Sequence, residues 1–320
     1  MTEKKHTAKP AYYLGFDGGG TKTDCFLVDA AGTVLQRATA GPSNPLRAGY
    51  AKAWFTLSDA GDFVLERQRL KADDIRGICA GIGGAGRDTV ARRIATFLER
   101  AFPEAGVQVT TDLAITLDAA LGDSKSEGVI LVVGTGSAAF GRDANGKTAR
   151  AGGRGPWFSD EGSAFDIGRR AMEAVVRAEE SRGPQTALSK KLLAWLGCND
   201  WTRVMDWVIK NPDDVFPRVF PLVAELGDKG DEVACDILST AAASLAQLAT
   251  SVTQKLEMHD RDILIAKSGG TIGRSKFFDT AIDNHLAGLV PRAKIVALQM
   301  KPAEAAARIA IHLGKRKAHA

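Results

Sequence analysis

The sequence predicts a duplicated α/β architecture in two domains. Short β-type runs alternate with helical-period runs along the chain, which is the pattern of α/β proteins. Two Gly-rich hairpins open the two halves, at Gly18 and Gly134, 116 positions apart. The 320 residues suit about two domains at roughly 100–200 residues each. Because nothing recurs at the roughly 20–50-residue period of a solenoid, we expect two related halves with a cleft between them.

The first half reads as a three-strand meander followed by a βαβ unit. Apolar and β-branched runs bounded by glycine predict the strands, and a helical period that Pro103 ends predicts the helix. The expected elements are strands 12–16, 24–28, 33–39, 77–82 and 106–110, with a helix over 89–102.

A similar opening recurs in the second half, where a continuous apolar strand leads into Gly-Thr-Gly-Ser at Gly134–Ser137. Four segments of helical period follow, and their Trp195, Trp201 and Trp207 are expected in the core. Pro302 suits the first turn of a final Ala-rich helix. The expected elements are strands 128–133, 138–142, 262–267 and one near 295, and helices 163–182, 186–196, 201–210, 231–256, 275–289 and 302–312.

Composition and charge exclude several classes of protein. With 45% hydrophobic and 25% charged residues the chain is an ordinary globular protein, and a net charge of +4 is too small for a nucleic-acid surface. The cysteines Cys25, Cys79, Cys198 and Cys235 lack zinc-ligand spacing. The first ten residues are polar, and no stretch approaches the roughly 20 apolar residues of a membrane span. We therefore expect a cytoplasmic protein with no membrane or nucleic-acid partner.

Three Gly-rich turns are suited to binding phosphate. In Asp17–Thr23, between two expected strands, glycines let backbone N–H groups approach an anion. The segment has neither Walker nor Rossmann spacing, because it turns from strand to strand. A plain glycine hairpin with a solvated Asp and Lys is the alternative. Gly134–Ser137 and Ser268–Thr271 end two further strands, and three such turns together predict a nucleotide site.

These residues resemble the superfamily of acetate and sugar kinases, heat-shock ATPases and actin, whose two phosphate motifs and adenosine motif occur in this order. The closer resemblance is to the BadF-type ATPase family, in its N-acetylglucosamine and glucosamine kinase branch. It covers nearly the whole chain after residue 10. The motifs that carry it are Phe16–Thr23, Pro42–Asn44, Thr111 with Asp112, Gly134–Ser137, and G-G-R-G-P-W-F-S-D-E-G-S at Gly152–Ser163.

The resemblance implies a two-domain, duplicated ribonuclease-H-like fold, as in actin and sugar-kinase ATPases, with ATP and substrate in the interdomain cleft. Residues 11–116 would form the N-terminal ATPase and sugar-binding lobe, to which a C-terminal helix over 302–316 returns. Residues 117–301 would form the C-terminal nucleotide-binding lobe. ATP and Mg²⁺ are the implied cofactors, a sugar is the implied substrate, and a homodimer is the implied assembly.

The resemblance also implies roles for single residues. Asp17 would hold Mg²⁺ through water, since Mg²⁺ keeps much of its hydration shell. Asp112 would be the general base that accepts the proton of a sugar hydroxyl. The nucleotide would contact Gly18, Gly19, Gly20, Thr21, Lys22, Gly134, Thr135, Gly136, Gly269 and Gly270. The sugar would contact Asn44, Asp112, Ser137, Gly153, Arg154 and Asp160.

Some of these residues also have a purely structural interpretation. Asp112 ends a strand and begins a helix, so it could serve as an N-cap. Asn44 lies in a Pro-Ser-Asn-Pro loop, where Asn is common for turn reasons alone. Asp160 and Glu161 precede a helix whose start Ser163 marks, a place that favours carboxylates in any protein.

The expected function is ATP-dependent phosphorylation of the 6-hydroxyl of N-acetylglucosamine or glucosamine. Ala138 after Ser137, and Arg154 in the Gly-Gly-Arg-Gly run, depart from the N-acetylglucosamine kinases and look more like the glucosamine kinase branch. An Arg near the substrate would not obviously favour a cationic 2-amino group. The choice of amino sugar stays open, and other hexoses remain alternatives.

Two alternatives belong to other classes of protein. An ATPase activator of a 2-hydroxyacyl-CoA dehydratase or benzoyl-CoA reductase would share an iron–sulfur cluster between subunits. Here Cys198 and Cys235 lie in expected helical segments without a Gly-rich cysteine motif. A sugar-sensing repressor would need a helix-turn-helix, for which the residues before Tyr12 are too few. Both alternatives are therefore weaker than the kinase.

Overall fold

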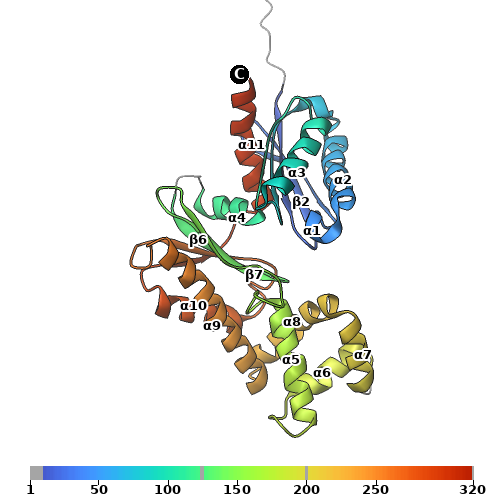
Figure 1. Cartoon of the computed structure of the whole chain (residues 1–320), viewed down its shortest axis with the longest axis vertical. Helices are drawn as coiled ribbons and strands as arrows, with labels where there is room; N and C mark the ends of the chain where they lie inside the picture. Colours follow the sequence, from blue (N-terminus) through green and yellow to red (C-terminus); the bar gives the residue numbers. More distant parts are fainter. Residues whose placement is uncertain (1–9, 123–125, 199–200, 319–320) are drawn as a thin grey trace, which may run out of the picture. The chain divides into compact units, whose positions relative to one another are not determined.

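Two five-stranded sheets, each in its own compact unit, organise the chain (Figure 1). Unit 1 combines Met1–Ser124 with Gln299–Ala320, and unit 2 is Lys125–Leu298. The computed structural model describes residues 10–122, 126–198 and 201–318, without the side chains of residues 202, 206, 207, 316 and 318.

The sheet of unit 1 has helices from both ends of the chain packed against it (Figure 1). Unit 1 contains β1 (Tyr12–Gly18), β2 (Thr23–Asp29), β3 (Val34–Ala40), α1 (Pro45–Ala48), α2 (Tyr50–Gln68), the 3₁₀ helix η1 (Ala72–Asp74), β4 (Ile75–Ile82), α3 (Asp88–Ala101), β5 (Gly106–Thr110), α4 (Asp112–Leu121) and α11 (Pro302–Ala318). The strand order is β3-β2-β1-β4-β5, with β1 antiparallel to β2 and parallel to β4. The predicted strands and the helix after β4 are confirmed to within two residues.

Unit 2 repeats this sheet with the same connections. It contains β6 (Gly128–Val133), β7 (Ser137–Arg142), β8 (Thr148–Gly152), α5 (Ala164–Glu179), α6 (Ala187–Leu196), α7 (Trp201–Lys210), α8 (Pro212–Asp228), α9 (Glu232–Lys255), β9 (Leu264–Ser268), α10 (Lys276–Leu289) and β10 (Lys294–Ala297). Its order, β8-β7-β6-β9-β10, matches that of unit 1 strand for strand. β6 is antiparallel to β7 and parallel to β9. The duplicated α/β fold is thereby confirmed.

The list of expected elements lacked several that the structure contains, among them the helices α2 and α8 and the edge strand β8. The buried face of α2 consists largely of small residues, whereas Phe55 is 71% exposed. The helical period of apolar residues in α2 is therefore hard to recognise in the sequence. α8 carries Pro217 and Pro221 inside the helix, where proline normally indicates a break. Apolar packing against α5 and α9 holds α8 in helical form despite both prolines.

The core of unit 2 corrects the placement of one tryptophan. Trp195 is 39% exposed, because Leu193 and Leu196 of the last turn of α6 are the residues that pack against the core. Trp201 is partly buried against that core, as predicted. The prediction for Trp207 concerns a side chain outside the described residues.

α9 differs from the expectation that no segment resembles a membrane span. Its 24 residues contain an 18-residue window with a mean hydropathy of 1.3, which by length and composition alone is enough to cross a membrane. In unit 2, however, α9 packs against β6, β7 and β8 and against α5, α8 and α10. One face, from Ala234 to Thr253, is buried. α9 is therefore a core helix of unit 2.

α11 packs closely on the sheet of unit 1 at positions where the strands carry glycine (Figure 1). A Cβ on Gly15 of β1 would lie 2.1 Å from the carbonyl oxygen of Ala303, and one on Gly77 of β4 would lie 2.1 Å from that of Ala310. The facing side of α11 is mainly alanine. Glycine on the sheet and alanine on the helix therefore allow backbone-to-backbone contact.

Candidate active site

Several of the predicted site residues lie where parallel strands end. In unit 1, Asp17 lies near the carboxyl end of β1, and Asp112 directly follows β5 and Thr111. In unit 2, Gly134 follows β6 and Gly269 follows β9. Because β1, β4 and β5 are parallel neighbours, as are β6, β9 and β10, their carboxyl ends meet at one edge of each sheet. In open α/β sheets this edge is where ligands bind.

The first Gly-rich turn of unit 1 presents free backbone donors. The N–H of Gly19 donates to the carbonyl of Lys22 at 2.9 Å, which closes the turn. Within the described part of the chain, the N–H groups of Gly20 and Thr21 donate no hydrogen bond. The Lys22 ammonium instead pairs with Asp24 at 2.6 Å and is 61% exposed. The turn can therefore bind an anion through its amides, while Lys22 is already paired.

The Pro-Ser-Asn segment is fastened to this turn. The N–H groups of Ser43 and Asn44 donate to the carbonyl of Gly19 at 3.2 and 3.1 Å. The Thr23 hydroxyl donates to Ser43 Oγ at 2.8 Å, and a Cβ on Gly18 would lie 2.1 Å from that Oγ. Gly18 thus serves close packing of Ser43 against the turn, a role that is independent of phosphate.

Asp17 lies in an electrostatically unfavourable place for a carboxylate. Burial, reinforced by the negative charges of Asp112 and Asp24, raises the pKa of Asp17 to about 7. Lys22 opposes this shift to a smaller extent. A carboxylate that is penalised by burial and by like charges gains from a cation beside it.

Asn44 and Asp112 border the same small space beside Gly83. Asn44 Oδ1 accepts from the N–H of Leu46 at 3.0 Å and caps α1, so the amide orientation is set. Asn44 Nδ2 lies 3.0 Å from the position that a Cβ on Gly83 would take, and Asp112 Oδ2 lies 3.5 Å from it. The structure thereby joins a hydrogen-bond donor and a carboxylate from segments 68 residues apart.

The N-cap interpretation of Asp112 is wrong. Thr111 is the N-cap of α4, and its side chain accepts from the N–H of Ala114 at 3.1 Å. Asp112 is the first residue of the helix, where the positive end of the helix dipole favours its charge. Because Thr111 supplies the N-cap, the carboxylate of Asp112 is not needed to cap the start of α4.

Gly83 and the following Gly84 border the candidate site, and the sequence analysis did not name them. The available signal was a Gly-Gly pair directly after the buried strand β4. At Gly84, φ is +90° and a Cβ would lie 2.9 Å from Leu46 Cδ1. The loop after β4 must therefore carry glycine for Asn44 and its neighbours to approach.

Gly83→Ala is expected to lower sugar-dependent turnover on the order of tenfold to a hundredfold, because a methyl group would enter the space beside Asn44 and Asp112. Its backbone is not in the left-handed region, so stability should change little. Steady-state kinetics and thermal unfolding measure the two effects. Gly86→Ala is the matched control in the same loop, since its nearest contact would be an ordinary 3.6 Å to Thr111. Equal turnover in both variants would contradict the assignment.

The second Gly-rich turn lies at the start of α5. The N–H of Gly134 donates to the carbonyl of Gly136 at 2.8 Å, and the carbonyl of Gly134 accepts from Ala164 at 2.9 Å. Ser163 is the N-cap of α5, as the sequence predicts. The turn is thus held by the first backbone amides of a helix, which fixes its conformation before any ligand binds.

The third Gly-rich turn packs against the end of β6. Gly269 has φ +112°, and a Cβ there would lie 2.1 Å from the carbonyl oxygen of Val133. The Thr271 hydroxyl donates to that same oxygen at 2.9 Å. The N–H nitrogen of Gly270 lies 3.9 Å from the Cβ position of Gly134. The second and third turns are therefore neighbours in unit 2.

Asp160 and Ser137 lie beside the second turn. Asp160 is buried with φ +69°, and its Oδ2 lies 2.6 Å from the position that a Cβ on Gly136 would take. The Ser137 hydroxyl donates to the carbonyl of Glu161 at 2.7 Å. Gly153 also has positive φ, and Arg154 is exposed. The structure brings Gly136, Ser137 and Asp160 together, whereas Arg154 points to solvent.

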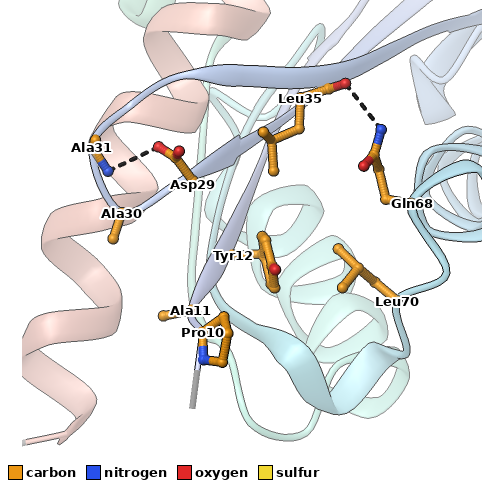
Figure 2. Close-up of a pocket in the computed structure, with 9 residues that line it drawn as sticks. All are labelled: Pro10, Ala11, Tyr12, Asp29, Ala30, Ala31, Leu35, Gln68 and Leu70. Carbon is orange, nitrogen blue, oxygen red and sulfur yellow. Dashed lines mark hydrogen bonds between the residues drawn. The ribbon is translucent and has the colours of Figure 1, made fainter. Parts of the chain in front are cut away.

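A cavity in unit 1 lies at the other end of β1 (Figure 2). It has a volume of about 500 Å³, and Tyr12, Leu35 and Leu70 line it. Because β1 runs from Tyr12 to Gly18, this cavity is separated from Asp17 by the length of the strand. It contains none of the predicted site residues.

The cysteines occupy four unrelated places. Cys25 and Cys79 are buried in β2 and β4, as predicted, and burial raises the pKa of both thiols. Cys198 follows α6 instead of lying in a helix, which corrects the prediction, and Cys235 lies in α9. Among the described residues, no three His, Cys, Asp or Glu side chains form a metal-binding group. The cysteine positions give no support to the activator alternative.

Two sheets of the order β3-β2-β1-β4-β5, with Gly-rich turns after their first strands, define the duplicated ATPase fold that sugar kinases share with actin. A ROK family glucokinase from Streptomyces griseus, solved with glucose and AMPPNP, has this fold. It matches with a TM-score of 0.64 at 16% identity, over 94% of this chain and 100% of that chain. The model of the BadF/BadG/BcrA/BcrD ATPase family matches residues 14–310. The chain belongs to this family.

Two relatives of established name match almost end to end. N-acetyl-D-glucosamine kinase of Dictyostelium discoideum is 27% identical over 315 residues, covering 95% of this chain and 98% of the relative. N-acetylmuramic acid/N-acetylglucosamine kinase of Clostridium acetobutylicum is 29% identical over 302 residues, covering 93% and 98%. Both relatives are kinases of amino sugars by name.

Proposed function

We propose that the protein is an ATP-dependent sugar kinase that phosphorylates an amino sugar, N-acetylglucosamine or glucosamine, at its 6-hydroxyl. The observation that carries the proposal is the approach of Asn44 and Asp112 to one space beside Gly83, next to a turn with free backbone donors. The family and the named activities of the relatives support the same reaction class.

Asp112 acts as the general base. Its carboxylate accepts the proton of the 6-hydroxyl while the sugar oxygen forms a bond to the γ-phosphorus and the bond from that phosphorus to the ADP oxygen breaks. A positioned base contributes about 10²–10⁴-fold to such a step. The rest of the catalysis is positioning and charge stabilisation, because the transferring phosphoryl group needs little covalent help from the protein.

The Gly-rich turns bind the nucleotide. The amides of Gly20 and Thr21 donate to phosphate oxygens from unit 1, with Gly18, Gly19 and the backbone of Lys22 shaping the turn. In unit 2, Gly134, Thr135 and Gly136 contact phosphate, and Gly269 and Gly270 allow the adenosine to approach the backbone. The free donors in unit 1 and the adjacency of the two turns in unit 2 support this division.

The residues around Asp17 fit Mg²⁺. Asp17 and Asp112 are hard oxygen donors near one another, and a cation beside Asp17 would offset the burial and the like charges that raise its pKa. Few carboxylates are needed, since Mg²⁺ usually keeps several waters and takes its other ligands from phosphate. Asp17 would hold the ion through water. The ion supplies neutralisation of phosphate charge when bound.

Each unit contains residues that are proposed to contact a sugar. Asn44 donates from Nδ2 to a sugar hydroxyl, because its Oδ1 is already used as the cap of α1. Ser137, Gly153, Arg154 and Asp160 contribute from unit 2. The buried carboxylate of Asp160 is suited to accept from sugar hydroxyls. Exposed Arg154 would have to turn toward the sugar when it binds.

The test is sugar-dependent ADP release by the purified protein with Mg²⁺ and ATP, with the phosphosugar identified by mass. The acceptors are N-acetylglucosamine, glucosamine, N-acetylmuramic acid, glucose, mannose and no sugar. We expect equal amounts of ADP and a 6-phosphorylated amino sugar, with little phosphorylation of glucose or mannose. ATP hydrolysis that is indifferent to every sugar would contradict the proposal and favour the activator class.

Two further proposals concern the setting of the enzyme. We place the protein in the cytoplasm, because its four cysteines are free thiols and the proposed reaction consumes ATP. A homodimer remains a prediction, and light scattering would check it as twice the chain mass of 33.9 kDa.

A further inference from the structure

Arg47 lies over the first Gly-rich turn. It is exposed on α1, and its Cδ and Nη1 lie 3.1 and 3.4 Å from the position that a Cβ on Gly20 would take. Within the part of the chain that the structure describes, the Arg47 side chain makes no hydrogen bond and no ion pair. The Arg47 guanidinium thus lies close to Gly20, whose N–H donates no hydrogen bond within the described residues.

The position of Arg47 is imposed by the short helix that carries it. Asn44 caps α1, Pro45 begins it, and the N–H of Arg47 donates to the carbonyl of Asn44 at 3.1 Å. Gly49, with φ +81°, ends α1 through a hydrogen bond to the carbonyl of Pro45. The segment that directs Asn44 toward Gly83 therefore also directs Arg47 toward Gly20.

Among the described residues, Lys22 has an ionic partner, whereas Arg47 beside Gly20 has none. The charges of Asp112 and Asp24 act on Asp17 in this part of unit 1, and Lys22 is paired with Asp24. A planar guanidinium can donate two parallel hydrogen bonds to phosphate oxygens, which a single ammonium cannot match in geometry. Gly20 matters here as well, because a side chain at that position would meet the Arg47 stem.

We propose that Arg47 is a further catalytic residue, which binds the γ-phosphoryl group of ATP and stabilises the charge on its oxygens during transfer. This inference rests on the proposed function where it concerns the rate of sugar phosphorylation. Its prediction for nucleotide binding does not depend on any sugar, because Arg47 can contact the nucleotide whenever the γ-phosphate reaches Gly20 and Thr21.

The binding experiment is calorimetric titration of AMPPNP and of ADP, each with Mg²⁺, into wild type, Arg47→Ala, Arg47→Lys and Arg92→Ala. Arg92 is an exposed arginine of α3 and serves as the matched control. We expect Arg47→Ala to weaken AMPPNP about tenfold and to leave ADP unchanged, because ADP lacks the γ-phosphate. Arg47→Lys should recover part of the loss. Thermal unfolding should not change, since the Arg47 side chain makes no hydrogen bond or ion pair with any residue that the structure describes.

The kinetic experiment uses the same variants with saturating amino sugar. Arg47→Ala should lower kcat on the order of 10²–10³-fold, as expected for loss of a cation at the transferring group, with the KM for sugar nearly unchanged. Unaltered AMPPNP binding in Arg47→Ala would overturn the inference, and so would a rise in sugar KM with kcat retained. A wild type that binds AMPPNP more tightly than ADP but phosphorylates no sugar would overturn the proposed function alone.

Discussion

Asp112→Asn is expected to lower kcat for phosphosugar formation by about 10²–10⁴-fold, because an amide of the same size cannot accept the hydroxyl proton. The fold should survive the change. Thr111 still caps α4, and the amide oxygen of Asn can still accept from the N–H of Leu113, which lies 3.0 Å from Asp112 Oδ1. Coupled ADP release at saturating substrates and thermal unfolding measure the two quantities.

The control for this prediction is Asp88→Asn. Asp88 is also the first residue of a helix in unit 1, it is exposed, and it lies at the start of α3. Both variants lose a charge at a helix N-terminus, which contributes about 0.3–1 kcal/mol to stability. Only the Asp112 variant should lose turnover. An Asp112→Asn enzyme with wild-type kcat would remove the proposed base.

Gly77→Ala is expected to lower the free energy of unfolding by about 3 kcal/mol or more. The new Cβ would lie 2.1 Å from the carbonyl oxygen of Ala310 and 3.1 Å from the N–H nitrogen of Gly314, both in the backbone of α11. Overpacking typically costs about 1–3 kcal/mol when side chains can adjust. Here the obstacle is helix backbone, so α11 as a whole must move away from β4.

Denaturant unfolding and amide hydrogen exchange measure this effect, with loss of protection expected first in α11. Gly41→Ala is the control in the same unit, since its nearest neighbour would be Thr56 Oγ1 at 4.0 Å. If Gly77→Ala and Gly41→Ala unfolded with the same free energy, the close packing of α11 on the sheet would be wrong.

The strands and their duplication could be predicted because their causes are local. Runs such as Val129–Val133 are apolar enough to be buried on both faces, and the glycines at both ends of each hairpin indicate the turns. α2 and α8 escaped prediction for the opposite reason. Small buried residues in one, and Pro217 and Pro221 in the other, obscure a helix that packing against neighbouring elements holds in place.

The candidate site likewise has features that the sequence predicts and features that only the folded structure shows. The Gly-rich turns and the Thr111-Asp112 pair are recognisable in the chain, because backbone conformation and a helix start depend on residues next to one another. The space beside Gly83 is not recognisable there, since it exists only where Asn44, Gly83 and Asp112 approach from three segments. The same holds for Arg47 over Gly20, and for the glycines of β1 and β4 beneath α11.

The amino-acid sequence alone was thus enough for the class of fold, the three Gly-rich turns and the resemblance to ATP-dependent sugar kinases. Tertiary structure was needed to show that Thr111 and not Asp112 caps α4, that Lys22 pairs with Asp24, and that Arg47 lies beside Gly20. The physical reason is the distance along the chain over which each interaction acts. Turn and strand preferences act between adjacent residues, whereas the partner of a charged side chain depends on segments that only the folded chain brings within a few ångströms.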